Sequence, residues 1–140
     1  MESYTCRGTW KGVSYLRVRI KDNALKENKM VKKIMKMLSA SQHCVLNCKK
    51  VINNWIIDSD DGELLLEFSV VDNEVTFNTV SLKEKRKGTL TSIVNTLLRE
   101  KMSVAFISVM TPEMYRFCDK NGFELYDKSF GFGSYRKKCK

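Results

Sequence analysis

The chain has 140 residues, 43% of them hydrophobic, so it is long enough to bury the core of a single domain spanning residues 1–140. Its formal net charge of +9 favours an anionic partner: a phosphate ligand, a nucleic acid or an acidic protein surface. No apolar run approaches the ~20 residues that span a bilayer, and none follows Met1 as in a signal peptide. We therefore expect a cytoplasmic protein without membrane contact, whose five cysteines are reduced.

The first third of the chain shows a strand pattern and then a helix pattern. Apolar and basic residues alternate over residues 15–20, which predicts a half-buried strand preceded by a loop or a ragged first strand. A helix follows, capped by Asp22 or Asn23, with apolar residues at helical spacing: Val31, Ile34, Met35 and Leu38. Its lysines are expected to face water rather than a polyanion. The Ser-Ala-Ser run at 39–41 predicts a break, and a short second helix is expected over residues 42–49.

Two cysteines in that short segment have a spacing that a metal site can use. Cys44 and Cys48 would lie one turn apart on a helix, but a closed zinc site needs four ligands. Cys6 and Cys139 would have to come from opposite ends of the chain, so we expect packed thiols and no metal. His43 is the one histidine, and no catalytic partner is evident for it.

The middle of the chain predicts three antiparallel strands in a meander. The expected strands cover residues 51–57, 63–71 and 75–80, with apolar and polar positions alternating in the second. The acidic run at 58–62 ends in glycine and predicts a tight turn, as does the Asp-Asn pair at 72–73.

A basic turn and an amphipathic helix follow the third strand. The turn carries Lys83, Lys85, Arg86 and Lys87, then Gly88 and Thr89. The helix is expected over residues 89–100, with one apolar stripe. Helix N-termini present unpaired N–H groups and partial positive charge, and glycine lets a ligand approach the backbone, so the turn predicts a phosphate cradle. The alternative is a solvated basic loop that caps a core helix, because neither a P-loop nor a dinucleotide-binding pattern is present.

The last third predicts a buried strand, a helix and a closing pair of strands. The near-continuous apolar run at 103–110 favours a strand that is buried on both faces and paired in parallel after a helical crossover. Thr111 and Pro112 predict a helix start, and the Asn-Gly pair at 121–122 predicts its end. The closing strands are expected over residues 123–127 and 130–136.

Two segments together resemble the GNAT superfamily of N-acetyltransferases. The first, V-S-L-K-E-K-R-K-G-T-L, is similar to the family's strand-turn-helix motif for the acyl-CoA pyrophosphate. The second, T-P-E-M-Y-R-F-C-D-K-N-G-F, is similar to its later helix and closing Lys-x-Gly-Phe. The resemblance covers the second half of the chain well and the first half only by the order of elements. It implies an α/β (α+β) fold with a mixed, mostly antiparallel sheet that splays at the cofactor cleft and is flanked by helices.

The resemblance also implies how acetyl-CoA would be held. Backbone groups of Val80 and Leu82 would pair with the pantetheine arm and polarise the thioester carbonyl, while Thr111 offers a hydroxyl nearby. Amides of the turn would hold the pyrophosphate, at Lys85, Arg86, Lys87, Gly88, Thr89 and Leu90. Two of these residues depart from the family pattern: Lys85 replaces the usual arginine or glutamine at the first motif position, and Leu90 replaces the small residue at the last.

The resemblance leaves the acid and the base open. The tyrosine that commonly protonates the departing thiolate aligns with Cys118, and Tyr115, one turn earlier, is an alternative acid. Glu67, on a strand next to the cleft strand, is the first candidate for the base.

The leading hypothesis is an acyl-CoA-dependent N-acetyltransferase that moves an acetyl group to an unidentified primary amine. The alternative is a catalytically reduced relative that binds CoA or a protein partner, which the cysteine at 118 and the leucine at 90 favour. A basic nucleic-acid-binding module is less favoured, because no aromatic residues are interleaved with the lysines. A monomer and a homodimer are both compatible with the sequence.

Overall fold

The computed structural model describes residues 4–8, 22–84, 87–129 and 132–139. The strand predicted at 15–20 and the site residues Lys85 and Arg86 lie outside them. The elements are, in order, β1 Tyr4–Gly8, α1 Asp22–Gln42, β2 Leu46–Val51, β3 Asn54–Ser59, β4 Leu65–Val71, β5 Glu74–Ser81, α2 Thr89–Arg99, β6 Ser103–Val109, α3 Pro112–Lys120, β7 Glu124–Ser129 and β8 Phe132–Lys137.

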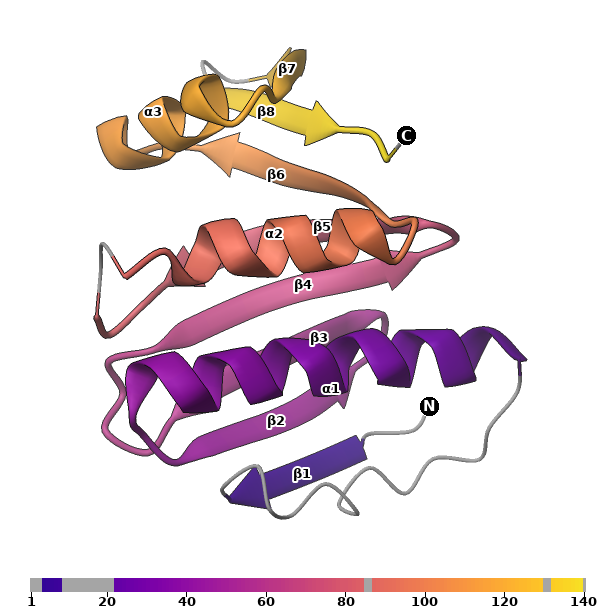
Figure 1. Ribbon diagram of the computed structural model, residues 1–140, viewed down its shortest axis with the longest axis vertical. Coiled ribbons are helices and arrows are strands. Elements are labelled where there is room, and N and C mark those ends of the chain that lie inside the picture. The colour runs from indigo at the N-terminus through magenta and orange to yellow at the C-terminus, as the bar shows by residue number, and fades with distance from the viewer. Residues whose placement is uncertain (1–3, 9–21, 85–86, 130–131, 140) are drawn as a thin grey trace.

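The described strands form one eight-stranded sheet in the order β1-β2-β3-β4-β5-β6-β8-β7 (Figure 1). All neighbouring strands pair antiparallel except β5 and β6, which run parallel on either side of the α2 crossover. The mixed, mostly antiparallel sheet that the sequence predicted is confirmed.

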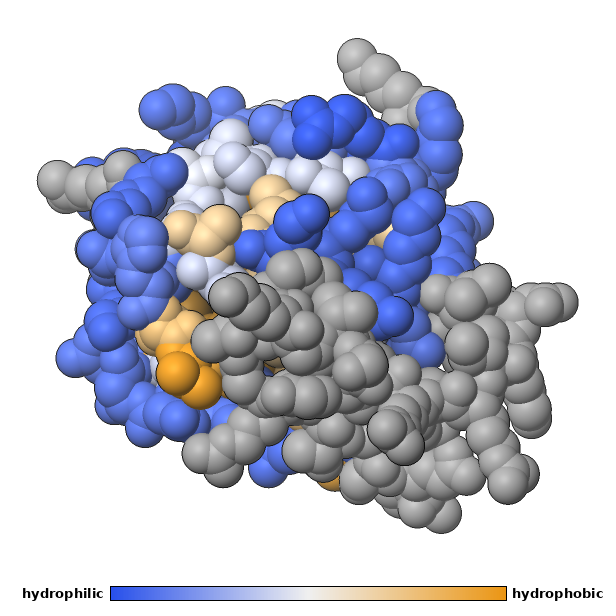
Figure 2. Space-filling model, turned by 60° about the horizontal axis from the view of Figure 1, so that its bottom comes forward, coloured by the Kyte–Doolittle hydropathy of each residue, from blue (hydrophilic) through white to orange (hydrophobic). Residues whose placement is uncertain are grey.

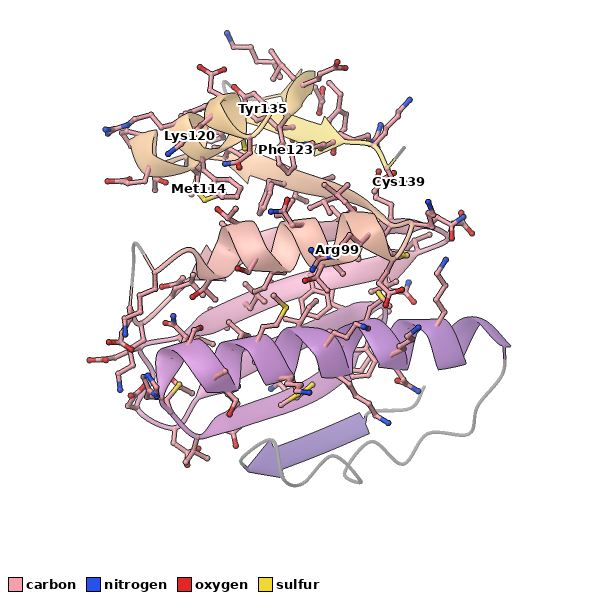
Figure 3. All side chains as sticks on the ribbon, viewed as in Figure 1. Arg99, Met114, Lys120, Phe123, Tyr135 and Cys139 are labelled. Atoms are coloured by element: carbon pink, nitrogen blue, oxygen red, sulfur yellow. The ribbon has the colours of Figure 1, made fainter. Side chains whose placement is uncertain are left out.

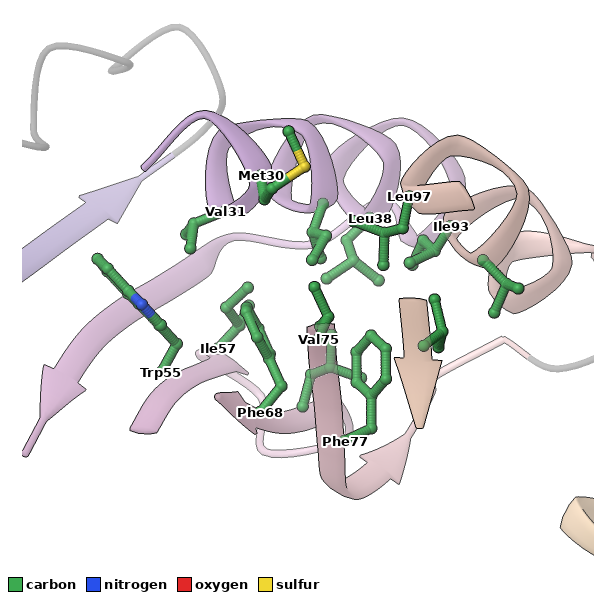
Figure 4. Close-up of a cluster of buried hydrophobic side chains, with 14 of the residues drawn as sticks. Met30, Val31, Leu38, Trp55, Ile57, Phe68, Val75, Phe77, Ile93 and Leu97 are labelled. Carbon is green, nitrogen blue, oxygen red and sulfur yellow. The ribbon is translucent and has the colours of Figure 1, made fainter. Parts of the chain in front are cut away.

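The core lies between the sheet and helices α1 and α2, which lie side by side over it (Figure 1). Apolar side chains of α1 and α2 meet buried residues that alternate along the strands (Figure 4). The buried members include Trp55, Ile57, Phe68, Phe77 and Phe106. Phe77 and Phe106 stack with ring centroids 5.2 Å apart, which joins the parallel pair on the helix side of the sheet.

Most elements of the second half are where the sequence predicted them. α2 buries the predicted stripe through Ile93, Val94 and Leu97. The Thr111 hydroxyl accepts a hydrogen bond from the Met114 N–H at 3.3 Å and so caps α3, with Pro112 in the first turn. The helix ends before Gly122, whose φ of 75° is the left-handed conformation expected there.

Two predictions for the first half are wrong. α1 does not break at residues 39–41 but runs to Gln42, and the segment expected as a second helix forms strand β2 instead. The strand expected over 51–57 begins later: residues 52–53 form a tight turn after β2, with Ile52 at a φ of 59°, and β3 starts at Asn54. Cys48 is therefore a buried strand residue, and the helical spacing from Cys44 is not present.

Most of the residues that are coloured in Figure 2 are hydrophilic, and apolar colour appears only in small areas between them. On α1, Lys29 and Lys33 do not simply face water: both form ion pairs with Glu100 at the end of α2, at 3.7 Å and 2.8 Å. Within the described ranges, no helix is long and apolar enough to cross a membrane.

Candidate active site

β5 and β6 are paired along only part of their length. Their register runs from Glu74 opposite Ser103 to Phe77 opposite Phe106. β5 then continues to Ser81 and β6 to Val109 without further pairing between them, so the sheet splays beyond the two phenylalanines. The strands part at the end of the sheet where α2 and α3 both begin (Figure 1). On this side of β5, the backbone beyond Phe77 therefore has no strand partner among the described residues.

Both strands are irregular where they part. The pairing of β4 with β5 shifts after Glu67, which faces Thr79, while Phe68 faces Phe77; Asn78 is thus the extra residue of a bulge. On β6, Ser108 has a φ of 53°, and its N–H donates to the buried Ser134 hydroxyl at 3.1 Å. β4 and β5 continue to pair beyond the bulge, whereas β5 and β6 stop pairing next to it.

Glu67 lies on β4 beside this opening. Its sequence neighbours Leu66 and Phe68 are buried under the helices, so the Glu67 side chain points to the opposite face of the sheet. The carboxylate is half-buried and accepts a hydrogen bond from the Thr79 hydroxyl at 3.3 Å. It is therefore held next to the strand end where the sheet opens.

The turn before α2 has a shape that fits an anion. Gly88 precedes the first residue of α2, has a φ of 72° and provides no capping side chain. A Cβ built on Gly88 would meet no atom of the described residues within 4 Å, so the space beside the backbone is open with respect to that part of the chain. The first N–H groups of a helix have no partner within the helix, so those at this turn can donate hydrogen bonds to the oxygens of a pyrophosphate.

The basic side chains described at this turn already have acidic partners. Lys83 contacts Asp61 at 2.7 Å and Glu63 at 3.9 Å, and Lys87 contacts Glu84 at 3.1 Å. The Lys83 ammonium, together with the Ser59 hydroxyl, holds the pKa of the Asp61 carboxyl well below its usual range. The backbone amides, rather than these two lysines, are thus the free part of the predicted phosphate cradle among the described residues.

Other predicted cofactor residues offer backbone rather than side chains. The side chains of Val80, Leu82 and Leu90 pack against the core, so Leu90 does not crowd the turn as a bulky residue there could. The Thr111 hydroxyl is engaged in capping α3. The residues present therefore fit a ligand held by main-chain groups.

The two candidate acids lie on α3. Cys118 is fully buried, and burial raises the pKa of its thiol to about 12. Tyr115 is half-buried and contacts Tyr135 edge-to-face, with ring centroids 5.9 Å apart. Met114 lies on the side of α3 that faces α2 (Figure 3). Glu67 points to the opposite face of the sheet. It and a candidate acid of α3 can therefore reach the same ligand only where β5 and β6 are separated.

Sequence reasoning missed one residue that contacts the turn. Gln42, the last residue of α1, is fully buried and hydrogen-bonds to Glu84 and Thr89 at the two ends of the turn. The only sequence signal is a polar residue after an apolar helix stripe, and the expected helix break concealed it.

Some solved structures resemble this chain at low sequence identity. No model of a known protein family matches the chain, and no curated protein sequence matches it. Solved structures that resemble it include PaiA N-acetyltransferase of Thermoplasma acidophilum, in complex with coenzyme A, at 12% identity over 99% of both chains and a TM-score of 0.46. N-acetyltransferase PseH of Campylobacter jejuni, in complex with acetyl coenzyme A, is 13% identical over 97% of this chain and 99% of that one, with a TM-score of 0.44.

A Desulfovibrio desulfuricans protein described as a GNAT-family acetyltransferase is 11% identical over 99% of this chain and 100% of its own, with a TM-score of 0.43. These likenesses are distant. The described strands of the chain form a mixed, mostly antiparallel sheet with one parallel pair.

Proposed function

We propose that the chain is an acyl-CoA-dependent N-acetyltransferase that transfers an acetyl group to a primary amine. The observation that carries the proposal is the early end of β5–β6 pairing at Phe77 and Phe106, while both strands continue. The thioester arm would lie between the separated strands, and the pyrophosphate would lie at the turn before α2.

In this proposal the backbone holds the ligand. Main-chain groups of Val80 and Leu82 would pair with the pantetheine arm and stabilise negative charge on the thioester oxygen. Amides of Gly88, Thr89 and Leu90 would hold the pyrophosphate, because their side chains face the core or are absent. Lys85 and Arg86 remain proposed as basic side chains of the same turn.

The proposed chemistry is direct attack of the neutral amine on the thioester carbonyl. A C–N bond forms, the C–S bond breaks, and the thiolate leaves with the electron pair. Glu67 would take the proton that the nitrogen loses, directly or through one water, and the Tyr115 hydroxyl would donate a proton to the thiolate. We assign the acid to Tyr115 rather than Cys118. The buried Cys118 thiol has a pKa of about 12, so it would have to give its proton to a CoA thiolate that is a weaker base than the Cys118 thiolate itself.

A second candidate function is binding of CoA without catalysis. The full burial of Cys118, at the position where the resembled family commonly has its acid, favours it. It shares the proposed cofactor site and differs only in the fate of the thioester.

A thiol-release assay with acetyl-CoA and a panel of primary amines tests the proposal. Release of free CoA by the wild type, a fall in kcat of about 100-fold or more in Tyr115→Phe, and a small change in Cys118→Ala are expected. The reverse order of the two variants would assign the acid to Cys118. Binding of acetyl-CoA with no release for any amine would favour the second candidate.

A further inference from the structure

The Gln42 side chain joins the end of α1 to the turn between β5 and α2. The Glu84 N–H donates to the Gln42 Oε1 at 2.7 Å, and the Gln42 Nε2 donates to the Glu84 carbonyl oxygen at 3.1 Å. One side-chain amide thus pairs with both backbone groups of a single turn residue. Gln42 is fully buried, so water does not compete for these bonds.

The same amide reaches the other end of the turn. The Gln42 Nε2 also lies 3.3 Å from the Thr89 hydroxyl and 3.4 Å from the Ser41 hydroxyl. The Thr89 hydroxyl in turn donates to the Ser41 hydroxyl at 2.9 Å. Thr89 is the first residue of α2 and is buried. The turn is therefore held at Glu84 and at Thr89 by two consecutive residues of α1.

No other amino acid supplies this set of bonds from that position. Glutamate keeps the acceptor but has no donor for the Glu84 carbonyl oxygen. Asparagine is one methylene shorter. Methionine has similar length and no polar amide, so it would leave the Glu84 N–H and carbonyl without this partner in a partly buried place.

We propose that Gln42 is a positioning residue that fixes the backbone at Glu84 and Thr89, the described residues on either side of the proposed pyrophosphate site. The inference rests on the proposed function. Among the described residues, Lys83 and Lys87 are paired with acidic residues, so the part of the site that they leave to the ligand is the amides near Gly88. A turn held in its binding conformation before the ligand arrives loses less entropy on binding.

Amide hydrogen exchange tests the contact itself. In Gln42→Met, the Glu84 amide is expected to exchange at least tenfold faster than in the wild type, while amides of β4 keep their protection. Gln42→Glu retains the acceptor and is expected to keep most of the Glu84 protection. Trp55→Phe is the control for general destabilisation, because it removes the buried Trp55–Glu27 hydrogen bond of α1 and β3 instead.

Calorimetric titration with CoA and steady-state kinetics test the positioning role. Gln42→Met is expected to raise the Kd for CoA and the KM for acetyl-CoA at least tenfold, with kcat within twofold, and Trp55→Phe should change neither by more than twofold. If the wild type binds CoA and folded Gln42→Met binds it with the same Kd, the inference is overturned and the proposed function stands. Absence of CoA binding by the wild type would overturn both.

Discussion

Glu74 on β5 and Arg136 on β8 form a two-point ion pair across the strand between them. The Arg136 Nε lies 2.7 Å from the Glu74 Oε2, and its Nη2 lies 3.2 Å from the Oε1. The small, buried Ala105 on β6 lies between the two strands. Arg136 also stacks over the Tyr126 ring at 4.3 Å. The pair fastens β5, β6 and β8 in the part of the sheet that stays closed, below the point where β5 and β6 separate.

Removing either partner should destabilise the fold. Both side chains are about two-thirds buried, so Glu74→Gln and Arg136→Met are each expected to lower the free energy of unfolding by about 1–2 kcal/mol, measured by urea denaturation. The double mutant should show a coupling energy of about 1 kcal/mol. Arg99→Met, which removes an exposed arginine with one 3.2 Å bond to Thr96, is the control. Additive single effects would contradict the assigned role of the pair.

The buried Cys118 thiol should make stability fall at alkaline pH. Burial raises the thiol pKa from 9.0 to about 12, so above pH 9 the unfolded chain loses a proton that the folded chain keeps. The contribution is fully present below pH 9 and is lost as the pH rises towards 12. Relative to Cys118→Ala, the wild type should lose about 1.4 kcal/mol per pH unit between pH 9 and 11. If urea denaturation shows that the free energy of unfolding changes with pH in the same way for both proteins over this range, the burial argument is refuted.

Lys83 should control the pKa of Asp61 and have little effect on the affinity for CoA. Its hydrogen bond is the main cause of the lowered pKa of the Asp61 carboxyl, so Lys83→Met should move the NMR titration midpoint of Asp61 up towards the ordinary ~3.9. Because the folded-state pKa is lowered, the stabilisation from this pair is present above about pH 4 and is lost as the pH falls. The Kd for CoA should change less than threefold. A much larger change would mean that Lys83 leaves Asp61 to bind the phosphates.

The sequence predicted the region from β4 to α3 because local patterns decide it. Alternation in β4, the stripe of α2, the Thr111–Pro112 start and the Gly122 stop are each contained within a few neighbouring residues. The separation of β5 and β6 was predicted only through the resemblance, because it depends on where the pairing between these two strands stops.

The region around β2 was mispredicted because distant contacts decide it. Ser39 and Ser41 are only mildly unfavourable in a helix and Ala40 is a strong helix former, so α1 continues through them to Gln42, whose amide binds a turn more than forty residues away. The β2–β3 turn places Ile52 at a φ of 59°, a conformation that β-branched residues rarely adopt, so Ile52 concealed the turn although Asn53 is a common turn residue. Leu46 and Cys48 do show the period of two that a strand requires.

Calorimetric titration of acetyl-CoA into the wild type and two glycine variants tests the central claim most directly. Gly88 and Gly62 have nearly equal φ, 72° and 74°, and a Cβ at either would meet nothing within 4 Å. Gly88→Asp and Gly62→Asp therefore add the same charge and similar backbone strain. The account predicts acetyl-CoA binding to the wild type and Gly62→Asp, and its loss in Gly88→Asp. No binding to the folded wild type, or equal binding to all three proteins, would contradict it.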